Sequence, residues 1–266
     1  MQIKDLLQTG GTSLEKEVLL ANLLCKSREF LISNSDYEVS NEQSERFYSL
    51  IRSHDRGVPV AYLIKHKEFY GLPFFVDSRV LIPRPETEFL VDKVLELIKG
   101  DSSLKRIVDI GTGSGNIACS VAKHTKDIEV FATDVSDKAL EVAKINAKKI
   151  GVTVSFIKSD LLDELKQMKF DIIVANLPYI GTSTNSFVSK ETQEHEPHVA
   201  LFGGEDGLEL YEKLFEQIED FKFLMGEVGF MHRDALEKLF KKYFPDSKCE
   251  VLKDLAGLDR YFIIKK

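Results

Sequence analysis

The sequence has 266 residues, of which 43% are hydrophobic and 30% are charged, and its formal net charge is −7 at pH 7. These proportions are typical of a globular protein, and the length allows one large α/β domain beside a smaller one. The negative charge argues against a broad duplex-binding surface, because Lys and Arg contacts to phosphate dominate such binding.

The cysteines and the hydropathy of the sequence indicate which compartment the protein occupies and whether it binds metal or membrane. The three cysteines are widely separated (Cys25, Cys119 and Cys249) and have neither disulfide nor metal-ligand spacing. We therefore expect a cytoplasmic protein without a metal site. No apolar run reaches membrane-spanning length, and the first residues lack the pattern of a signal peptide, so we expect no membrane association.

The first part of the chain, residues 1–67, has the apolar spacing of helices. Ser13 precedes an apolar stretch as a helix N-cap, and Ser40 with Gln43 has the spacing of a capping box. Pro59 suits the first turn of a further short helix. Because this region contains no catalytic constellation, we predict a small helical domain that recognises a partner.

Residues 68–83 change to two short strand patterns about a glycine turn, which predicts a β-hairpin linker to a second domain, residues 84–266. Arg84 lies between Pro83 and Pro85, so the chain is extended there before a helix begins. This segment is either a stiff linker with a helix cap or a gate over a cofactor pocket.

A predicted strand at residues 106–110 leads into a glycine-rich turn and then a helix. The turn consists of Gly111, Thr112, Gly113, Ser114 and Gly115. Such a turn allows a ligand to approach the backbone, and the N–H groups of the following helix face it. The dinucleotide fingerprint needs a small residue at position 116, where this chain has Asn116, so a nucleoside cofactor is favoured over NAD or FAD.

The next predicted strand, residues 130–134, ends in a carboxylate. Asp134 follows the glycine turn by about 20 residues, an offset at which an acidic side chain binds ribose hydroxyls. The alternative role is a helix cap. Ser136 is the better cap for the helix that follows, which leaves Asp134 available for a ligand.

A third predicted strand, residues 152–157, is also followed by an acid. Asp160 can accept a hydrogen bond from an adenine amino group, and Leu161 can pack against the ring. Because the carboxyl ends of parallel strands meet at one edge of a sheet, the glycine turn and the two carboxylates predict an adenosine site.

A buried strand, residues 170–175, precedes an Asn-Leu-Pro-Tyr sequence. The side-chain oxygen of Asn176 and the carbonyl of Leu177 can each accept a hydrogen bond, since Pro178 holds the residue before it extended. Tyr179 offers a flat face. Two acceptors over a ring bind a planar NH2 group, either a carboxamide or the exocyclic amine of a base. An ordinary strand-to-loop exit is the alternative.

The remaining elements complete an α/β pattern. Residues 180–206 are expected to be a polar loop, which at this length is usually functional, and its His-Glu pairs are a weak metal signal. We expect helices at residues 208–221 and 233–243, and strands at residues 223–228, 249–252 and 260–264.

The glycine turn, Asp134 and the Asn176–Tyr179 sequence occur in an order that resembles class I S-adenosylmethionine-dependent methyltransferases acting on planar nitrogens. The segments 81–88 and 203–208 are more specific. Together with Arg56, Pro59, Tyr62, Leu63, Phe69, Tyr70, Gly71, Glu196 and Pro197, they resemble the peptide chain release factor glutamine methyltransferases (the HemK/PrmC type).

This resemblance implies a Rossmann-like seven-stranded sheet with a reversed last strand, an N-terminal helical domain and a linking β-hairpin. It implies S-adenosylmethionine as cofactor and, as substrate, the glutamine side-chain amide in the Gly-Gly-Gln motif of class I release factors. It assigns catalysis and substrate binding to Asn176, Leu177, Pro178 and Tyr179. It assigns cofactor binding to Gly111, Thr112, Gly113, Ser114, Gly115, Asp134, Asp160, Leu161 and Asn176.

Leu177 stands where the family usually has a first proline, a form also seen in rRNA adenine dimethylases. The alternative is therefore an adenine-amino (N6) methyltransferase acting on RNA or DNA, and a second alternative is a non-catalytic binder that keeps the fold. The acidic balance weighs against the first, and intact Asn176 and Pro178 weigh against the second. We expect a monomer with no direct nucleic-acid binding.

Overall fold

The computed structural model describes residues 1–8, 14–182 and 189–266. The chain divides into two units. The first comprises Met1–His66 with Ser189–His195, and the second comprises Lys67–Val188 with Glu196–Lys266. Within the described residues, no helix combines the length and apolarity needed to cross a membrane.

The first unit is helical. Its helices in the described residues are α1 (Ile3–Gln8), α2 (Leu14–Leu24), α3 (Arg28–Ser33), α4 (Asn41–His54), α5 (Val60–Ile64) and α9 (Lys190–His195). Helices α1 to α5 contribute to one apolar core, which includes Leu19 and Phe47. The predicted capping box is confirmed, since Ser40 and Gln43 each accept a backbone N–H bond from the other. The expected N-cap Ser13 lies outside the described residues.

Helix α9 packs on the turn that follows α4. The Nε2 atom of His195 lies 3.1 Å from the carbonyl oxygen of Arg56. A Cβ added to Gly57, whose φ is +89°, would lie 3.1 Å from the same nitrogen. A segment far along the sequence is thus part of the helical unit, and the sequence did not indicate it.

The second unit begins with the expected hairpin, in which β1 (Lys67–Phe69) pairs antiparallel with β2 (Leu72–Phe74). The chain after β2 is held by Asn146, whose side chain accepts a bond from Phe75 N–H and donates to Phe75 O and Ser114 O. One buried amide therefore joins the end of the hairpin to the glycine turn.

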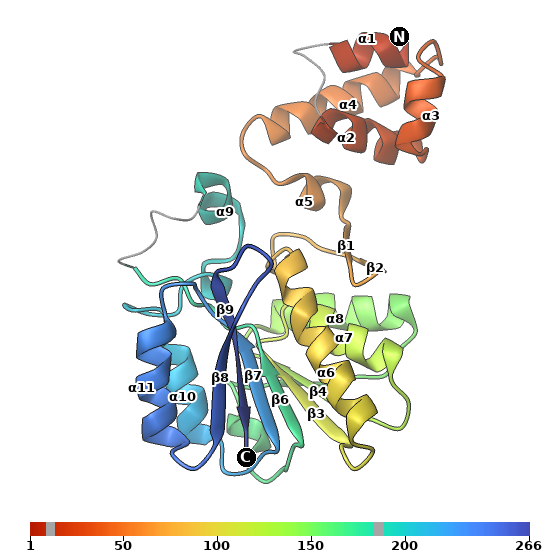
Figure 1. Cartoon of the computed structure of the whole chain (residues 1–266). Helices are drawn as coiled ribbons and strands as arrows, with labels where there is room; N and C mark the ends of the chain where they lie inside the picture. The colour runs from red at the N-terminus through yellow and green to blue at the C-terminus, as the bar shows by residue number, and fades with distance from the viewer. Residues whose placement is uncertain (9–13, 183–188) are drawn as a thin grey trace. The chain divides into compact units, whose positions relative to one another are not determined.

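Among the described residues, the other strands form one seven-stranded sheet in the order β5-β4-β3-β6-β7-β9-β8 (Figure 1). The strands are β3 (Arg106–Ile110), β4 (Glu129–Asp134), β5 (Ser155–Lys158), β6 (Ile172–Ala175), β7 (Phe223–Glu227), β8 (Lys248–Lys253) and β9 (Asp259–Lys265). The pairs from β5 to β7 are parallel, and β9 is antiparallel to both of its neighbours. The predicted seven-stranded sheet with a reversed last strand is confirmed.

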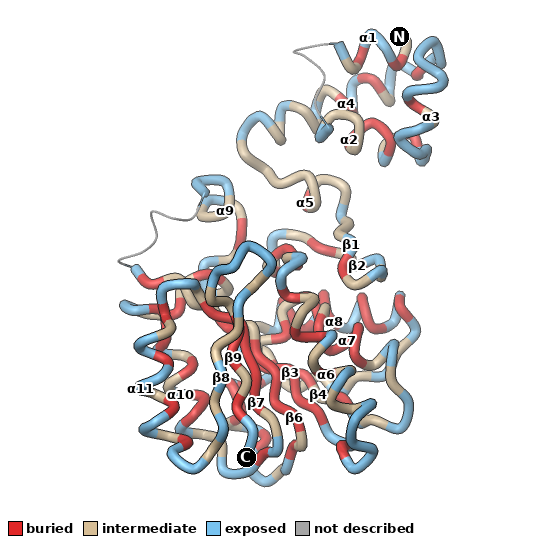
Figure 2. Tube along the Cα trace, viewed as in Figure 1, coloured by how far each residue is buried: buried red, intermediate tan, exposed pale blue. Residues whose placement is uncertain are grey.

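Helices cover both faces of this sheet (Figure 1). One face carries α6 (Glu88–Gly100), α7 (Asn116–His124) and α8 (Asp137–Ile150), and the other carries α10 (Glu209–Gln217) and α11 (Arg233–Tyr243). Figure 2 shows burial concentrated in the central strands and in the helix sides that face them. Because β4 and β6 flank β3 on opposite sides, the order of strands reverses at β3, which is where open α/β sheets bind ligands.

Three elements differ from the sequence expectation. Strand β5 starts at Ser155 because its pairing with β4 covers only Phe131–Asp134. Helix α10 ends at Gln217, since the next residue is extended and leads toward β7. Residues 180–206 are not a loop throughout, because the described part contains α9 and a short 3-10 helix, His198–Ala200.

Candidate active site

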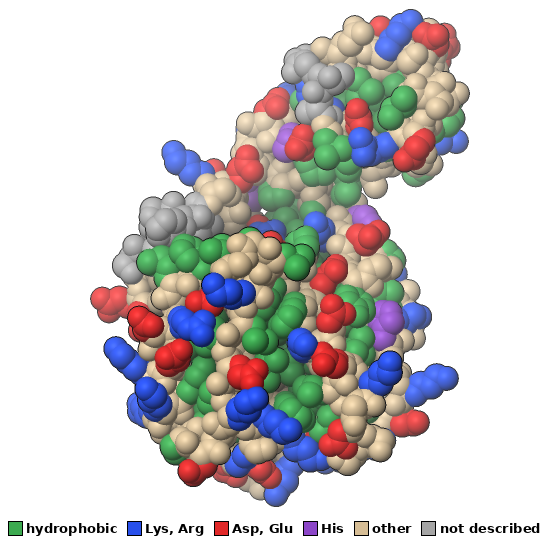
Figure 3. Space-filling model, in the orientation of Figure 1, with side chains coloured by type: hydrophobic (Ala, Val, Ile, Leu, Met, Phe, Trp, Pro, Cys, Tyr) green, Lys and Arg blue, Asp and Glu red, His purple; other side chains and the backbone are tan. Residues whose placement is uncertain are grey.

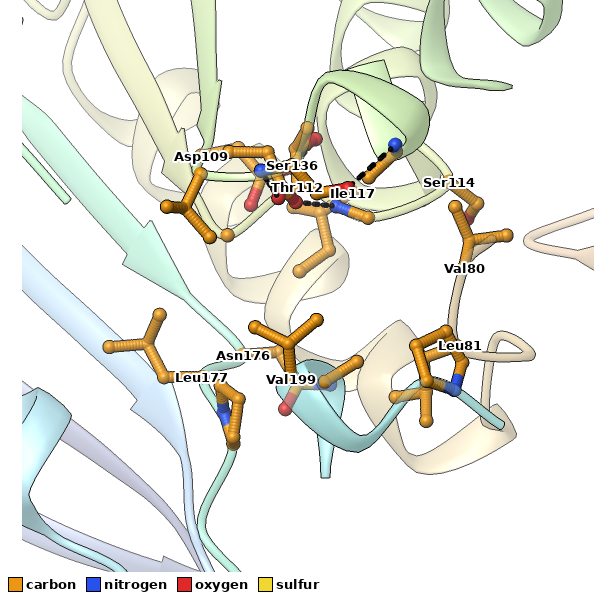
Figure 4. Close-up of a pocket in the computed structure, with 18 of the residues that line it drawn as sticks. Val80, Leu81, Asp109, Thr112, Ser114, Ile117, Ser136, Asn176, Leu177 and Val199 are labelled. Carbon is orange, nitrogen blue, oxygen red and sulfur yellow. Dashed lines mark hydrogen bonds between the residues drawn. The ribbon is translucent and has the colours of Figure 1, made fainter. Parts of the chain in front are cut away.

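A cavity of about 310 Å³ opens at the carboxyl ends of β3, β4 and β6 (Figure 4). The residues lining it come from the glycine turn, the strand ends, the segment before α6 and the chain after α9. They include Val80, Leu81, Pro83, Arg84, Thr87, Asp109, Gly111, Thr112, Gly113, Ser114, Asp134, Asp160, Leu161, Asn176, Leu177, Pro178, Pro197, Val199 and Lys213. All the predicted site residues except Gly115 and Tyr179 are in this lining.

The glycine turn needs glycine for two different reasons. Gly113 has φ +54°, and a Cβ placed there would meet no atom within 4 Å, so its backbone lies open to the cavity. Gly115 has φ +79° and caps α7; a Cβ there would lie 3.1 Å from the Ala143 side chain on α8. Gly113 therefore provides ligand access, whereas Gly115 allows two helices to pack closely.

Asp109, one residue before the end of β3, places a buried carboxyl group under the turn. Its Oδ2 atom accepts bonds from Thr112 Oγ1 at 2.6 Å and Ala118 N at 3.2 Å. Its Oδ1 atom has no partner among the described residues. Burial raises the pKa of Asp109 to about 7, against the lowering effect of these two bonds.

Asp134 lies at the end of β4 and holds the neighbouring backbone. Its two oxygens accept bonds from Gly113 N and Ser136 N, each at 2.9 Å. Ser136 caps α8 through Ala139 N, as the sequence predicted. Burial raises the pKa of Asp134. The carboxylate therefore orders the turn and also faces the cavity.

Asp160 and Leu161 line the cavity beyond β5. One carboxylate oxygen of Asp160 accepts from the ammonium group of Lys213, which also lines the cavity. Leu161 is buried and has φ +56°, so the chain turns sharply there. Their expected roles toward an adenine ring stay predictions.

The Asn-Leu-Pro-Tyr sequence leaves β6 at the edge of the cavity. Asn176 Nδ2 donates to Thr87 Oγ1 at 3.0 Å, and the backbone N–H of Leu177 donates to the hydroxyl of Tyr211 at 3.4 Å. Asn176, Leu177 and Pro178 line the cavity. Tyr179 does not, and its hydroxyl donates to Glu227 Oε1 at 3.1 Å.

Two glycines of the 203–208 run lie directly against this sequence. A Cβ on Gly203 would lie 2.1 Å from the carbonyl oxygen of Pro178, and one on Gly207 would lie 2.3 Å from that of Tyr179. Any side chain at either position would displace the backbone that carries the predicted catalytic residues. This contact explains why the run needs glycine.

The segment before α6 is joined to the chain after α9 by what we call the clasp, an ion pair between Arg84 and Glu196. The two side chains approach to 2.5 Å, and Glu196 Oε2 also accepts from Ile82 N at 3.0 Å. The Glu196 side chain is only 2% exposed, whereas that of Arg84 is 36% exposed. Residues next to the clasp on both segments, Leu81 and Val199, border the cavity in Figure 4. The segment predicted as a gate thus lies at the cavity, and opening stays a prediction.

Sequence reasoning missed three residues that hold the site: Asn146, Tyr211 and Glu227. Two of them carried a signal. Asn146 is a polar residue on the apolar face of its helix, and Glu227 ends a buried strand with an acid, as Asp134 does. Tyr211 looks like an ordinary core residue in the sequence. Glu196 belongs to the run that carries the family resemblance, but its pairing with Arg84 was not predicted.

Comparison with known proteins identifies the family. A methyltransferase small domain model matches residues 85–196, and a PrmC N-terminal domain model matches residues 4–64. The release factor glutamine methyltransferase of Bacillus subtilis is 38% identical over 265 residues, covering 96% of this chain and 92% of that protein. The chain belongs to the release factor glutamine methyltransferase family. The family member from Bacillus cereus is also 38% identical, over 92% of this chain and 89% of its own length.

Solved structures support the fold of this family member. The N-terminal domain of human METTL16 in complex with SAH has a TM-score of 0.55 at 18% identity, covering 92% of this chain and 93% of that one. The human METTL16 catalytic domain in complex with an RNA hairpin has a TM-score of 0.60 at 15% identity, covering 92% of each chain. At these identities the likeness concerns the fold alone, and the expected class I methyltransferase fold is confirmed.

The cavity suits a cationic nucleoside such as S-adenosylmethionine. Its lining contains three acids, Asp109, Asp134 and Asp160, and three bases, Arg79, Arg84 and Lys213. Lys213 pairs with Asp160, and the two arginines pair with acids outside the lining. Asp109 and Asp134 have no ion-pair partner among the described residues, and the Oδ1 atom of Asp109 has no hydrogen-bond partner there. The open backbone at Gly113 allows close approach of a ligand. These two acids and the open backbone are the features that can bind a positively charged, sugar-containing group.

Proposed function

We propose that this protein transfers a methyl group from S-adenosylmethionine to the side-chain amide nitrogen of glutamine in release factors. The observation that carries the proposal is one cavity lined by the glycine turn, the Asp134 carboxylate and the Asn176–Pro178 backbone. A donor site and an amide-binding site are thereby adjacent. Membership of the release factor glutamine methyltransferase family supports the choice of substrate.

S-adenosylmethionine, when bound, supplies a methyl group on a positively charged sulfur. The chain's own residues hold that group in place. Asp134 accepts the ribose hydroxyls while it keeps Gly113 in position, and the turn presents backbone N–H groups. Asp109 balances positive charge from beneath the turn. Asp160 and Leu161 hold the adenine end.

The substrate nitrogen is a weak nucleophile, because its lone pair is delocalised into the amide. Orientation therefore matters more than a strong base. The side-chain oxygen of Asn176 and the carbonyl of Leu177 accept the two N–H bonds of the amide and direct the nitrogen into the cavity. The same two oxygens stabilise the positive charge that develops on nitrogen, and the proton leaves afterwards. Packing of the Tyr179 ring on the amide plane is part of the proposal.

The finer features of the partner belong to the proposal as well. We take the substrate to be the Gly-Gly-Gln loop of class I release factors, and the enzyme to act as a cytoplasmic monomer without direct nucleic-acid contact. The net charge of −7 supports the last point. In Figure 3, acidic and basic side chains intermingle over the visible face of the second unit, with no large basic area on it.

Asn176 provides the decisive experiment. Turnover is measured on a release factor and on an adenine-containing oligonucleotide for the wild type, Asn176→Ala and Asn176→Asp. Loss of one charge-stabilising partner predicts that Asn176→Ala is slower by about a hundredfold or more with the cofactor affinity nearly unchanged. Asn176→Asp keeps an acceptor but adds a charge beside the sulfonium, so it is expected to change the balance between the two substrates.

Two results would reject the proposal. Wild-type activity on the oligonucleotide alone would assign the protein to the adenine-amino alternative. Full activity of Asn176→Ala would remove this residue from the mechanism. Calorimetry with the methyl donor on each variant is the control that separates a lost reaction from a lost binding site.

A further inference from the structure

We propose that Thr87 and Glu227 are positioning residues that turn the Asn176 side chain so that its oxygen, and not its amino group, faces the substrate amide. The inference rests on the proposed role of Asn176. It concerns three residues from separate parts of the second unit: Thr87 before α6, Asn176 after β6 and Glu227 at the end of β7.

The three side chains form a continuous hydrogen-bonded chain. Asn176 Nδ2 lies 3.0 Å from Thr87 Oγ1, and Thr87 Oγ1 lies 2.7 Å from Glu227 Oε2. Thr87 is 1% exposed and Glu227 is 2% exposed, so water does not compete for either bond. The other carboxylate oxygen of Glu227 accepts from the hydroxyl of Tyr179.

The number of protons determines the direction of every bond in this chain. An ionised carboxylate can only accept, so Thr87 must donate its single hydroxyl proton to Glu227. The Thr87 oxygen is then left as an acceptor, and only the NH2 group of Asn176 can donate to it. A reversed Asn176 would place its oxygen against the Thr87 oxygen with no proton between them. The side-chain oxygen therefore points away from Thr87, which leaves it for the substrate.

Glu227 is surrounded by charged and hydrogen-bonding groups that affect its ionisation. The titratable and charged groups acting on it, or acted on by it, are Glu86, Tyr179, Tyr211, Arg260 and Tyr261. Burial and the charge of Glu86 raise the pKa of Glu227, whereas Thr87, Tyr179 and the positive charge of Arg260 lower it. The net effect is a raised pKa, because burial is the largest contribution, while the two O–H donors and the guanidinium act in the opposite direction and stabilise the ionised form that the chain of bonds requires.

Protonation of Glu227 would remove the direction of the chain. A neutral carboxyl group can donate to Thr87, whose hydroxyl can then donate to the oxygen of Asn176. In that state the amino group of Asn176 would face the substrate N–H groups, donor against donor. Turnover should therefore fall on the acidic side as Glu227 gains a proton.

The test compares three single variants and one double variant on a release factor. Thr87→Val keeps the shape and removes the hydroxyl, Thr87→Ser keeps the hydroxyl, and Glu227→Gln removes the charge. Thr87→Val should lower kcat by about ten- to a hundredfold, with KM for the release factor and Kd for the cofactor near the wild-type values. Thr87→Ser should restore most of kcat. Because the residues act in series, Thr87→Val combined with Glu227→Gln should be no slower than Thr87→Val alone.

Two measurements respond to orientation and not to packing. The acidic limb of the kcat profile should be present in the wild type and absent in Glu227→Gln. In NMR spectra of the unliganded protein, the side-chain NH2 signal of Asn176, assigned by its loss in Asn176→Ala, should exchange slowly in the wild type and Thr87→Ser. It should exchange rapidly in Thr87→Val.

The inference fails if Thr87→Val turns over at the wild-type rate, or if Thr87→Ser is as slow as Thr87→Val, since the hydroxyl would then have no role. It also fails if the acidic limb persists in Glu227→Gln. These outcomes are distinct from failure of the proposed function, which would appear as a wild-type enzyme inactive on release factor. If Glu227→Gln does not fold, the two Thr87 variants and the NMR measurement still decide.

Discussion

At the scale of single residues, carboxylates hold the backbone around the site, and we propose that they also bind the ligand. Asp134 orders the glycine turn through Gly113 and is proposed to bind ribose. Asp109 lies beneath the same turn with one oxygen lacking a partner among the described residues. Burial raises the pKa of both side chains. Each role can be measured separately.

Replacing Asp134 by Ala should weaken cofactor binding. A hydrogen bond to a charged group contributes roughly 1.5–3 kcal/mol, so the dissociation constant should rise by about ten- to a hundredfold. Isothermal calorimetry measures it. Asp137→Ala is the matched control, because that exposed acid lies three residues away and does not line the cavity. Equal affinity of wild type and Asp134→Ala would contradict the ribose assignment.

Asp109 should make the stability of the unliganded protein depend on pH. Its pKa is about 7 in the folded state, against about 3.9 in an unfolded chain. The folded state therefore binds the extra proton between these values, and stability is lost as pH rises from about 4 through 7. The loss is on the order of 4 kcal/mol at most.

The Asp109→Asn variant should lack this fall, so its free energy of unfolding should increase relative to that of the wild type as the pH rises from about 4 through 7. Urea unfolding at several pH values measures the slope. Asp246→Asn, at an exposed position, is expected to keep the wild-type slope. An identical slope for wild type and Asp109→Asn would show that the buried carboxyl group does not titrate in this range.

At the scale of elements, the segment after α9 packs against the backbone of the predicted catalytic sequence. Gly203→Ala would place a Cβ 2.1 Å from the Pro178 carbonyl and 2.9 Å from that of Gly207. The backbone must move, and a displacement of about 1 Å can cost roughly a hundredfold in rate. We expect kcat to fall by at least about tenfold in a release factor assay. Gly100→Ala, where a Cβ meets no atom within 4 Å, should leave kcat unchanged.

The clasp should control how readily the cavity opens. In Arg84→Ala the bond from Ile82 N is the one that the buried Glu196 carboxylate keeps among the described residues. Since Arg84 is partly exposed, we expect a loss of about 1–3 kcal/mol in unfolding free energy and faster cofactor release. Denaturation and stopped-flow release measure the two effects. Lys93→Ala, which breaks an exposed ion pair with Glu96, is the control and should change neither.

At the scale of the whole molecule, the two units are expected to divide the work. Deleting residues 1–66 removes most of the first unit and leaves the second unit, with its cavity, intact in sequence. Cofactor affinity should stay near the wild-type value, whereas methylation of an intact release factor should collapse because the proposed recognition surface is gone. Calorimetry reports the first property and checks folding. Full-rate methylation by the truncated enzyme would show that the helical unit does not recognise the substrate.

The sequence by itself determined the order of the elements and many of the residues that line the cavity. Local signals were sufficient where one short segment carries the information. Examples are the capping box at Ser40, the glycine turn before Asn116 and the alternation of strands with helices that predicts a parallel sheet. Parallel strands bring their carboxyl ends together, so Asp134 and Asn176 could be assigned to one site from their positions alone.

Only the tertiary structure showed which residues hold those side chains in place. Thr87 bonds to Asn176, 89 residues away, and to Glu227, 140 residues away. Arg84 and Glu196 are 112 residues apart. The periodicity of a sequence does not indicate contacts between residues so far apart. The same holds for α9, which belongs to the helical unit although the sequence places it after β6. Periodicity reflects which side of an element is buried. Which polar groups pair inside the protein depends on how separate elements pack, and that is set by the fold as a whole.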